Sequence, residues 1–306
     1  MTDLDQEFAR ARASAVHHLG EDLGERIAAL GRVGFRLDLL EDGEETGRDE
    51  HGAPQGGSRL GGAALLAPGM PWPTFRDIPM TLLAVLDLAE FVPPLKDGLP
   101  DGAADLVLNF FHSAPNVHLY DGGVNFWADP GTWRVVAAAK SEATVTAAPE
   151  PAVRFRPAPV RAVPFATYPE AEEPMVDALI SGPSGDRFDF DVWNDLSARY
   201  RTWSQELPSY TRSGRHQAFG WPWILHHSPT DEGLRNLAER DPAAAATAPP
   251  PEDWRLLLQL NSDGRVLTEE GKAWWQWADF GELHFVIPAA DLRAGDFSRV
   301  EAAVQG

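Results

Sequence analysis

The chain has 306 residues, 43% of them hydrophobic, which is enough to bury the core of one large domain or two ordinary ones. A formal net charge of −20 disfavours binding to nucleic-acid phosphates or anionic lipid surfaces, so a macromolecular partner would be neutral or basic. Solubility alone is the alternative explanation of this charge. Cysteine is absent, so disulfides, thiolate nucleophiles and cysteine zinc sites are excluded.

The first part of the chain, residues 1–57, predicts a helix, a strand and a loop. Apolar side chains recur at helical spacing over residues 3–31, with acidic residues in the first turn. Residues 33–39 then alternate as in a strand. Residues 41–57 combine glycine, proline and charge without a period, which is typical of an exposed loop. We therefore expect an N-terminal amphipathic helix.

From residue 58 onward, short apolar runs separated by glycine and proline predict a mainly antiparallel sheet, because parallel strands need intervening helices. Residues 147–174 are rich in proline and should lie at a sheet edge or along the surface. The predicted strands are 81–88, 104–111, 116–120, 132–139, 153–163, 254–261 and 281–287. The predicted helices are 170–180, 191–205 and a short one before an Ala/Pro loop at 241–252.

Two parts of this region resemble each other. "MTLLAVLDLAE" is similar to "DWRLLLQLNSD", and each is preceded by a Gly/Pro/Trp element and followed by a further strand. We predict an α+β fold, mainly antiparallel and pseudo-duplicated as a single body. Its domains would be 1–57 and 58–306, with similar halves at about 58–140 and 215–306. Two separate domains, one for each half, are the alternative.

The sequence carries no strong signature of metal binding or catalysis. Walker, Rossmann and nucleophile-elbow motifs are absent. His226 and His227 are adjacent, so their side chains diverge in a strand or a helix. Asp189 and Asp191 would share a face of an extended segment, but Asp191 is better explained as the N-cap of a helix over 192–203. We expect no metal and no cofactor.

The eleven tryptophans stand out, because seven of them lie between residues 203 and 277. Tryptophan is favoured in cores that border water and at recognition sites. In "AWWQW", Trp275 and Trp277 would share one face of an extended segment and Trp274 the other. We expect Trp277 in the core and Trp274 or Trp275 at a ligand. Trp223 and Gln259 complete the predicted ligand-binding set.

Five motifs occur in a recognisable order: "SRLGGAALL", "TLLAVLDLAE", "LPDGAADLVLNFF", "WRLLLQLNSD" and "WADFGELHFVIPAADLRAGDFSRV". In their order and spacing they resemble the YwqG-like family of bacterial proteins, over about residues 58–306. The resemblance implies a compact α+β fold with no established catalytic activity. It also implies a protein-binding role, because family members resemble components of gene neighbourhoods with polymorphic toxins and their immunity proteins.

Three positions depart from that family pattern. Many relatives have glutamine where this chain has Val85 and His226, and glycine where it has Ala278. If those glutamines line a shared polar site, only Gln259 remains here to serve it. A ligand common to the family is therefore not implied for this chain.

The first functional hypothesis is a non-catalytic, immunity-like binding protein with a basic protein partner or a small-molecule ligand. Its cleft would lie between the similar halves and be floored by Trp277, Asp279 and Gln259. The acidic first residues do not resemble a basic signal peptide, and no run approaches the roughly 20 apolar residues of a membrane span, so we expect a cytoplasmic protein.

The second hypothesis is an enzyme acting on a small molecule in an aromatic pocket, either a hydrolase or a biosynthetic tailoring enzyme. Its acid–base groups would come from Asp279, Asp263, His226 and His227. It requires at least two polar side chains within hydrogen-bond reach of one point in a pocket. A purely structural fold without a cleft is the third alternative.

Overall fold

The computed structural model describes residues 2–40, 57–95, 98–121, 125, 129, 131–181, 190–207 and 216–306. Within them a ten-stranded sheet has the order β16-β15-β12-β11-β1-β10-β2-β6-β7-β8, and every neighbouring pair is antiparallel. The strands are β1 (Arg32–Leu39), β2 (Arg59–Leu60), β6 (Thr81–Asp87), β7 (Leu106–His112), β8 (Trp133–Ala139), β10 (Ala158–Thr167), β11 (His216–Phe219), β12 (Trp254–Asn261), β15 (Glu282–Pro288) and β16 (Glu301–Gln305). The predicted α+β class is confirmed.

The strand order is symmetric about the central pair β1 and β10. On one side β2, β6, β7 and β8 follow one another, and on the other side β11, β12, β15 and β16 do. Both halves also carry a register shift at the same place, at Leu83 in β6 and at Leu257 in β12. One extra residue at the same position of both strands is a specific feature. It supports the predicted pseudo-duplication within a single body.

The turn that ends the first strand of each half is also repeated. Gly61 and Gly62 follow β2 with φ of 64° and 78°, and Phe219 and Gly220 end β11 with φ of 56° and 75°. Gly220 has a second constraint, since a Cβ there would lie 2.8 Å from the Cα of Gly34. The close approach of β11 to β1 therefore requires glycine at that position.

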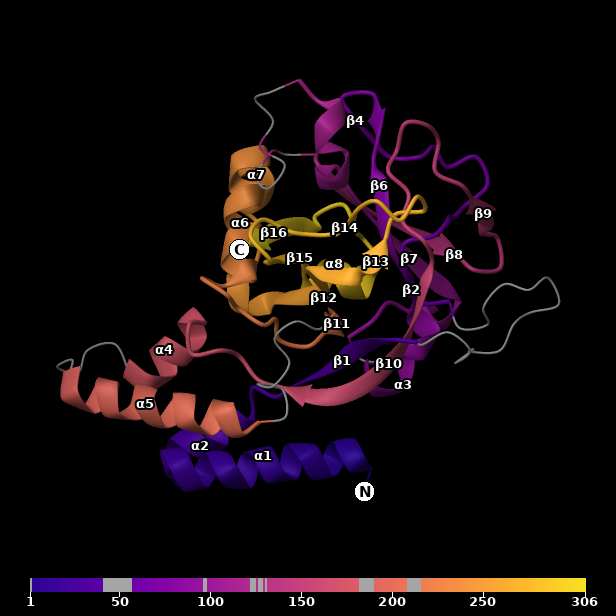
Figure 1. The fold of residues 1–306 in the computed structure, drawn as a ribbon. Coiled ribbons are helices and arrows are strands. Elements are labelled where there is room, and N and C mark those ends of the chain that lie inside the picture. Colours follow the sequence, from indigo (N-terminus) through magenta and orange to yellow (C-terminus); the bar gives the residue numbers. More distant parts are fainter. Residues whose placement is uncertain are drawn as a thin grey trace.

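The sheet curls so that its two edges come together around the main core (Figure 1). Phe110 of β7 and Phe285 of β15 meet there, with ring centroids 5.2 Å apart. Trp133, the first residue of β8, donates its indole N–H to the carbonyl of Val300, just before β16, at 2.9 Å. Apolar burial from both halves thus builds one shared core.

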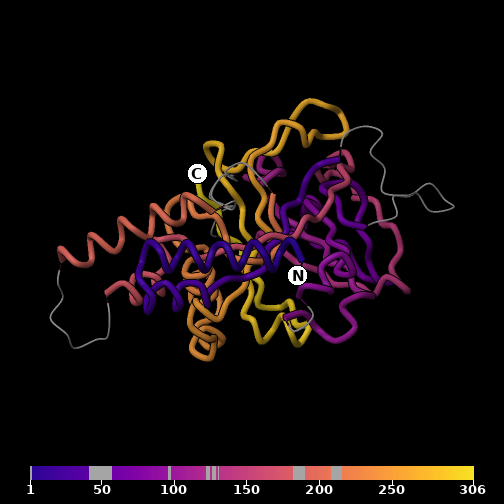
Figure 2. The backbone as a smooth tube through the Cα atoms, turned by 90° about the horizontal axis from the view of Figure 1, so that it is seen from below, coloured from indigo at the N-terminus to yellow at the C-terminus, as the bar shows by residue number. Residues whose placement is uncertain are grey.

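A helical layer covers the underside of the sheet. It contains α1 (Asp3–Leu19), α2 (Glu21–Ala28), α4 (Pro174–Ser181) and α5 (Phe190–Glu206), which bury Trp203 and Tyr200 in a core of their own. Figure 2 shows α1, in indigo, lying across this side beside α5. The single helix predicted over 3–31 is wrong, because Gly20 has φ of 84° and divides it.

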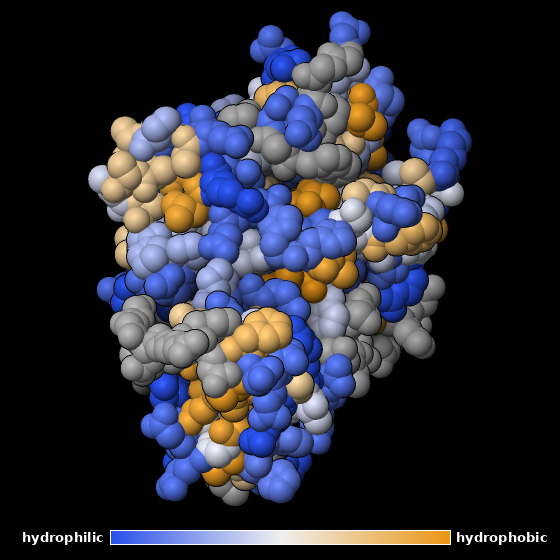
Figure 3. All heavy atoms as spheres, turned by 90° about the vertical axis from the view of Figure 1, so that its left-hand side faces the viewer, coloured by the Kyte–Doolittle hydropathy of each residue, from blue (hydrophilic) through white to orange (hydrophobic). Residues whose placement is uncertain are grey.

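Smaller elements complete the fold. The helices α6 (Pro229–Arg240) and α7 (Pro242–Ala245) cover the outer face of the second half. The others are β3 (Ala64–Leu66), β4 (Thr74–Phe75), β5 (Ile78–Pro79), α3 (Val92–Leu95), β9 (Thr144–Thr146), β13 (Asp263–Leu267), β14 (Trp274–Trp275) and α8 (Ala289–Ala294). On the side that carries α4 to α7, hydrophilic side chains predominate and apolar patches are separate (Figure 3). In the described stretches, no helix is both long and apolar enough to cross a membrane.

Three local predictions are corrected. Residues 114–119 form a 3-10 helix with Pro115 in its first turn, where a strand at 116–120 was expected. The proline-rich strand β10 lies at the centre of the sheet. Among the described residues it pairs with β2 only through Ala158 and Pro159, so proline interrupts few ladder hydrogen bonds on that side. Helix α5 begins before Asp191, which lies in its first turn and not at its cap. Asp189 and residues 41–56 lie outside the described part.

Candidate functional site

The structure gathers the three clustered tryptophans at one groove. Trp274 and Trp275 form β14, which pairs with β13, and Trp277 follows. Trp275 and Trp277 are each 1% exposed, whereas Trp274 is half-buried. The groove has a volume of about 300 Å³. Its walls come from both halves of the chain: Ala114, Pro115, Val117, Phe155, Trp274, Trp275, Gln276, Trp277 and Ala278.

The groove floor is rigid and aromatic. The ring of Trp275 lies between those of Phe155 and Trp277, with centroid distances of 5.6 and 6.1 Å. The backbone N–H of Trp277 donates to the hydroxyl of Ser262 at 2.9 Å, and that hydroxyl donates to the carbonyl of Gly281 at 3.0 Å. These bonds fix the chain between β14 and β15.

Two polar groups in this floor lack partners. The indole nitrogens of Trp275 and Trp277 are buried, and neither has a hydrogen-bond acceptor in the described structure. Leaving a buried donor unpaired costs about 1–3 kcal/mol. Both nitrogens are enclosed by the protein itself, so they are a cost to the fold and not contacts that the groove offers to a ligand.

The rim of the groove exposes large apolar side chains. Val117 is 53% exposed on one side, and Phe280, which is 70% exposed, lies against Trp274 with ring centroids 5.6 Å apart on the other. Ala278 and Phe280 both have positive φ, so the turn that carries this rim is tightly constrained. Asp279 lies in the same turn and is exposed.

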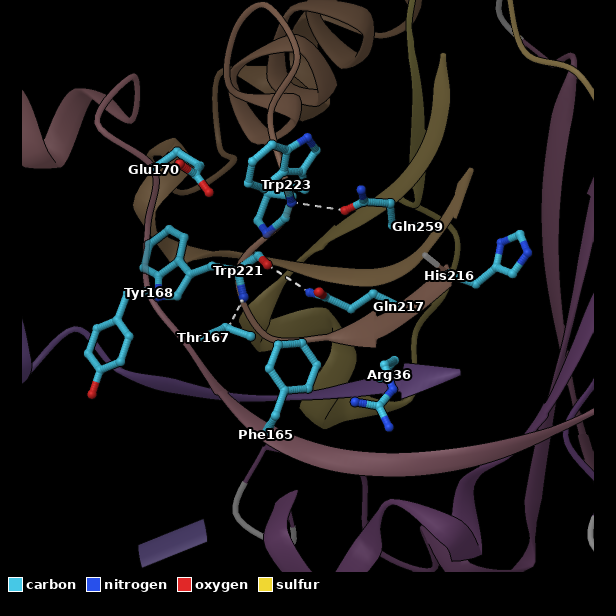
Figure 4. A pocket seen from close by; sticks show the side chains of 11 residues that line it. Arg36, Phe165, Thr167, Tyr168, Glu170, His216, Gln217, Trp221, Trp223 and Gln259 are labelled. Carbon is cyan, nitrogen blue, oxygen red and sulfur yellow. Dashed lines mark hydrogen bonds between the residues drawn. The ribbon is translucent and has the colours of Figure 1, made fainter. Parts of the chain in front are cut away.

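Gln259 and Trp223 meet at a different place, a polar pocket on the outer face of the second half (Figure 4). The carbonyl oxygen of Gln259 accepts the backbone N–H of Trp223 at 2.9 Å. Gln217 donates to the carbonyls of Phe219 and Trp221 at 2.9 and 2.7 Å. The cavity measures about 20 Å³, which is room for about one water molecule. Its side chains mainly hold the loop after β11.

The cleft that the sequence suggested is therefore not assembled. Along β12, Leu258 and Leu260 point into the core that contains Trp277, so Gln259 between them points to the opposite face. The five predicted ligand-binding residues divide into two places, with three tryptophans at the groove and Gln259 with Trp223 at the polar pocket.

Besides Arg36, Tyr168 and His216, the polar pocket contains a carboxyl group, that of Glu170, which was not among the predicted site residues. Burial raises the pKa of Glu170 to about 8, with a further contribution from the carboxyl groups of Glu172 and Glu173. In Figure 4 Glu170 lies on the opposite side of Trp223 from Gln259. No spacing motif marks Glu170, because its acid–base character arises from burial in the fold.

Asp263 is engaged in a structural network. Burial alone raises its pKa, but hydrogen bonds from His216 and Arg265 outweigh this and hold the pKa well below its ordinary value. His216 Nδ1 accepts the backbone N–H of Asn261 at 3.3 Å, so Nε2 carries the proton toward Asp263. This imidazole has no free nitrogen to act as a base.

The other predicted acid–base residues lie apart from Asp263. His227 is about half exposed and pairs with Glu232 at 2.9 Å. His226 is exposed, and its backbone N–H donates to Gln305. Asp279 lies at the groove rim. The structure thus does not bring Asp279, Asp263, His226 and His227 together, and in the described stretches no three His, Asp or Glu side chains form a group that could hold a metal ion.

These features define an α+β protein built on one curled antiparallel sheet, with an aromatic groove between its halves. A family model described as "Domain of unknown function (DUF1963)" matches residues 58–305, and the chain belongs to that family. No curated protein matches the sequence.

Proposed function

We propose that this protein is a non-catalytic binding protein that captures an extended segment of a partner protein in the tryptophan groove. The observation that carries the proposal is the apolar groove of about 300 Å³, with Trp274 half-buried in its wall and Val117 and Phe280 exposed at its rim. Apolar side chains of an extended segment would cover Val117, Phe280 and the accessible part of Trp274.

The charge of the protein favours a basic partner. A net charge of −20 attracts a positively charged surface and speeds its association at low salt. The engagement of Asp263 and His227 with neighbouring side chains also favours binding over catalysis. A cytoplasmic location is part of this proposal.

The test uses synthetic peptides of alternating leucine and lysine, and matched peptides of leucine and glutamate, titrated against tryptophan fluorescence. We expect the lysine peptide to bind and the glutamate peptide to bind at least tenfold more weakly. Val117→Asp at the rim should weaken binding at least tenfold. Val145→Asp is the matched control, because Val145 is 72% exposed on β9, outside the groove.

Equal binding to the Val117 and Val145 variants, or no binding of either peptide, would overturn the proposal. If the lysine peptide binds, the immobilised protein is used to capture a partner from a lysate of the native host at low salt. The Val145→Asp protein should capture the same partner, and the Val117→Asp protein should not.

We further propose that the chain belongs to the YwqG-like group within its family. All five motifs that carry the resemblance lie within the matched residues 58–305. An immunity-like role follows from that resemblance, and a toxin gene beside the native gene would support it.

The second candidate function is an enzyme, favoured by Glu170 with its raised pKa of about 8 in a pocket walled by tryptophan. A substrate would have to displace Trp223, because the cavity measures only about 20 Å³. Turnover of a panel of nitrophenyl esters and glycosides that is lost in Glu170→Gln would support it, and the absence of any turnover would count against it.

A further inference from the structure

A cavity of about 600 Å³, twice the volume of the tryptophan groove, lies at one end of the curled sheet. Its walls come from the start of β1, the turn after β11, the start of β12, helix α8 and the segment around α3. Ligand pockets of roughly 300–1,000 Å³ commonly hold small molecules. The volume therefore suits a small organic molecule.

Three arginine side chains line this cavity: Arg32, Arg255 and Arg293. The guanidinium of Arg32 lies 3.5 Å from the ring centroid of Trp221 and donates to the carbonyls of Glu252 and Trp254 at 2.9 and 3.3 Å. Arg255 donates to the same two carbonyls at 3.1 and 2.7 Å. The main chain before β12 thus holds two guanidinium groups close to each other.

These arginines have no counter-charge in contact. Within the described part of the chain, no carboxylate oxygen lies within 4.0 Å of any of the three guanidinium groups, although Asp253 lines the same cavity. Burial, with repulsion from Arg255, lowers the pKa of Arg32 to about 9, against a weaker opposing attraction from Glu173 and Asp253 at longer range. Grouping like charges without a contacting carboxylate is costly for Arg32 and Arg255, which are half-buried, whereas Arg293 is exposed. This grouping occurs in a protein with 46 acidic residues.

The rest of the cavity wall is largely apolar. Leu95, Leu99 and Leu292 line it and also pack against the main core. Guanidinium groups recognise carboxylates and phosphates through paired hydrogen bonds. We propose that this cavity binds a small organic anion with an apolar body, its carboxylate or phosphate group between Arg255 and Arg293 and its apolar part against the three leucines.

This site is independent of the tryptophan groove, because it selects the opposite charge and shares no lining residue with it. Isothermal titration calorimetry with decanoate, decyl phosphate and the uncharged decanol tests it on the full chain. Binding of either anion, at least tenfold tighter than decanol, is expected. The two anions show whether the carboxylate or the phosphate is the preferred end group.

The test variant is the double substitution Arg255→Met with Arg293→Met, which spares the more buried Arg32. It should weaken binding of the anions at least tenfold. Arg235→Met is the control, because Arg235 is exposed on α6, outside the cavity. Thermal unfolding without ligand checks that both variants are folded.

Binding of both anions no tighter than that of decanol, no binding of either anion, or undiminished anion binding to a folded double variant would overturn the proposal. Decanoate binding by Val117→Asp and lysine-peptide binding by the double variant should both stay normal. Failure at one site can therefore be distinguished from failure at the other.

Discussion

The two halves of the sheet share a backbone plan but differ in the chemistry of their outer faces. In the first half, Val85 and Val107 are fully buried in an apolar cluster under β3. By register, Gln259 and Glu282 occupy the same positions in the second half, where Gln259 donates to the Glu282 carboxyl at 2.7 Å. The shared arrangement of strands therefore does not require a buried polar network, and only the second half has one at these positions.

Both halves use a side chain to hold the segment that follows their first strand. Asn109 alone accepts from the N–H and donates to the C=O of Leu65, at 2.8 and 2.7 Å. In the second half this work is divided, because Gln259 accepts the N–H of Trp223 and His284 Nε2 bonds its carbonyl at 3.1 Å. The first half needs no polar side chain at Val85, because Asn109 makes both bonds.

The largest expected effect on stability comes from giving Val107 of the first half the carboxyl side chain that its counterpart Glu282 has in the second half. Val107→Glu buries a carboxyl in the apolar cluster without a partner and should lower the free energy of unfolding by about 3–5 kcal/mol. Urea unfolding followed by tryptophan fluorescence measures it. Val145→Glu, at an exposed position, is the control. A loss below about 1 kcal/mol for Val107→Glu would show that this face tolerates charge.

The reverse exchange removes the polar network from the second half. Glu282→Val leaves the side-chain donors of Gln259 and Asn261 unpaired and should cost about 2–4 kcal/mol. Adding Gln259→Val should cost less than the sum of the two single changes, with a coupling energy of about 1 kcal/mol in a double-mutant cycle. Strict additivity would contradict the view that these side chains act as one network.

The two halves also differ just where their third strands begin, at Gly281 before β15 and at Leu106 in β7. A Cβ at Gly281 would lie 1.7 Å from the carbonyl oxygen of Gln305, whereas the first half carries Leu106 at the corresponding position. Gly281→Ala should destabilise by about 1–3 kcal/mol, because β16 must shift. Gly264→Ala, with nothing within 4 Å, should change little. Equal thermal stability of the two variants would refute this account.

The last effect depends on pH and concerns Glu170, on the polar outer face. Its folded-state pKa of about 8 lies above the ordinary value of 4.5, so the folded state binds the proton more tightly and stability falls as pH rises between these values. Glu170→Gln should therefore be more stable than the wild type at pH 8 by at least about 1 kcal/mol, since one pKa unit is worth about 1.4 kcal/mol. An equal difference at pH 5 and pH 8 in chemical unfolding would contradict it.

Much of the sheet could be predicted because local patterns specify it. The apolar runs at 81–88, 254–261 and 281–287 became β6, β12 and β15 with small shifts at their ends. Short β11 and β16 and the break at Gly20 were missed, because their backbones are decided by neighbouring strands and helices. A helical period can continue across a glycine that ends the helix.

The functional residues divide in the same way. The three tryptophans were singled out by composition, and they do lie at one groove. Gln259 was assigned to the same cleft, but its place in the alternation of β12 sends it to the other face. Glu170 and the three arginines carry no motif, since they matter only through burial and through neighbours distant in the sequence.

The sequence alone determined the strands with strong apolar patterns, the likeness of the two halves and the tryptophan cluster, because each is set by nearest neighbours along the chain. Only the tertiary structure decided that β1 lies at the centre of the sheet between β10 and β11, and that Arg32 comes beside Arg255. Both depend on strands closing across long stretches of chain, which no local spacing encodes.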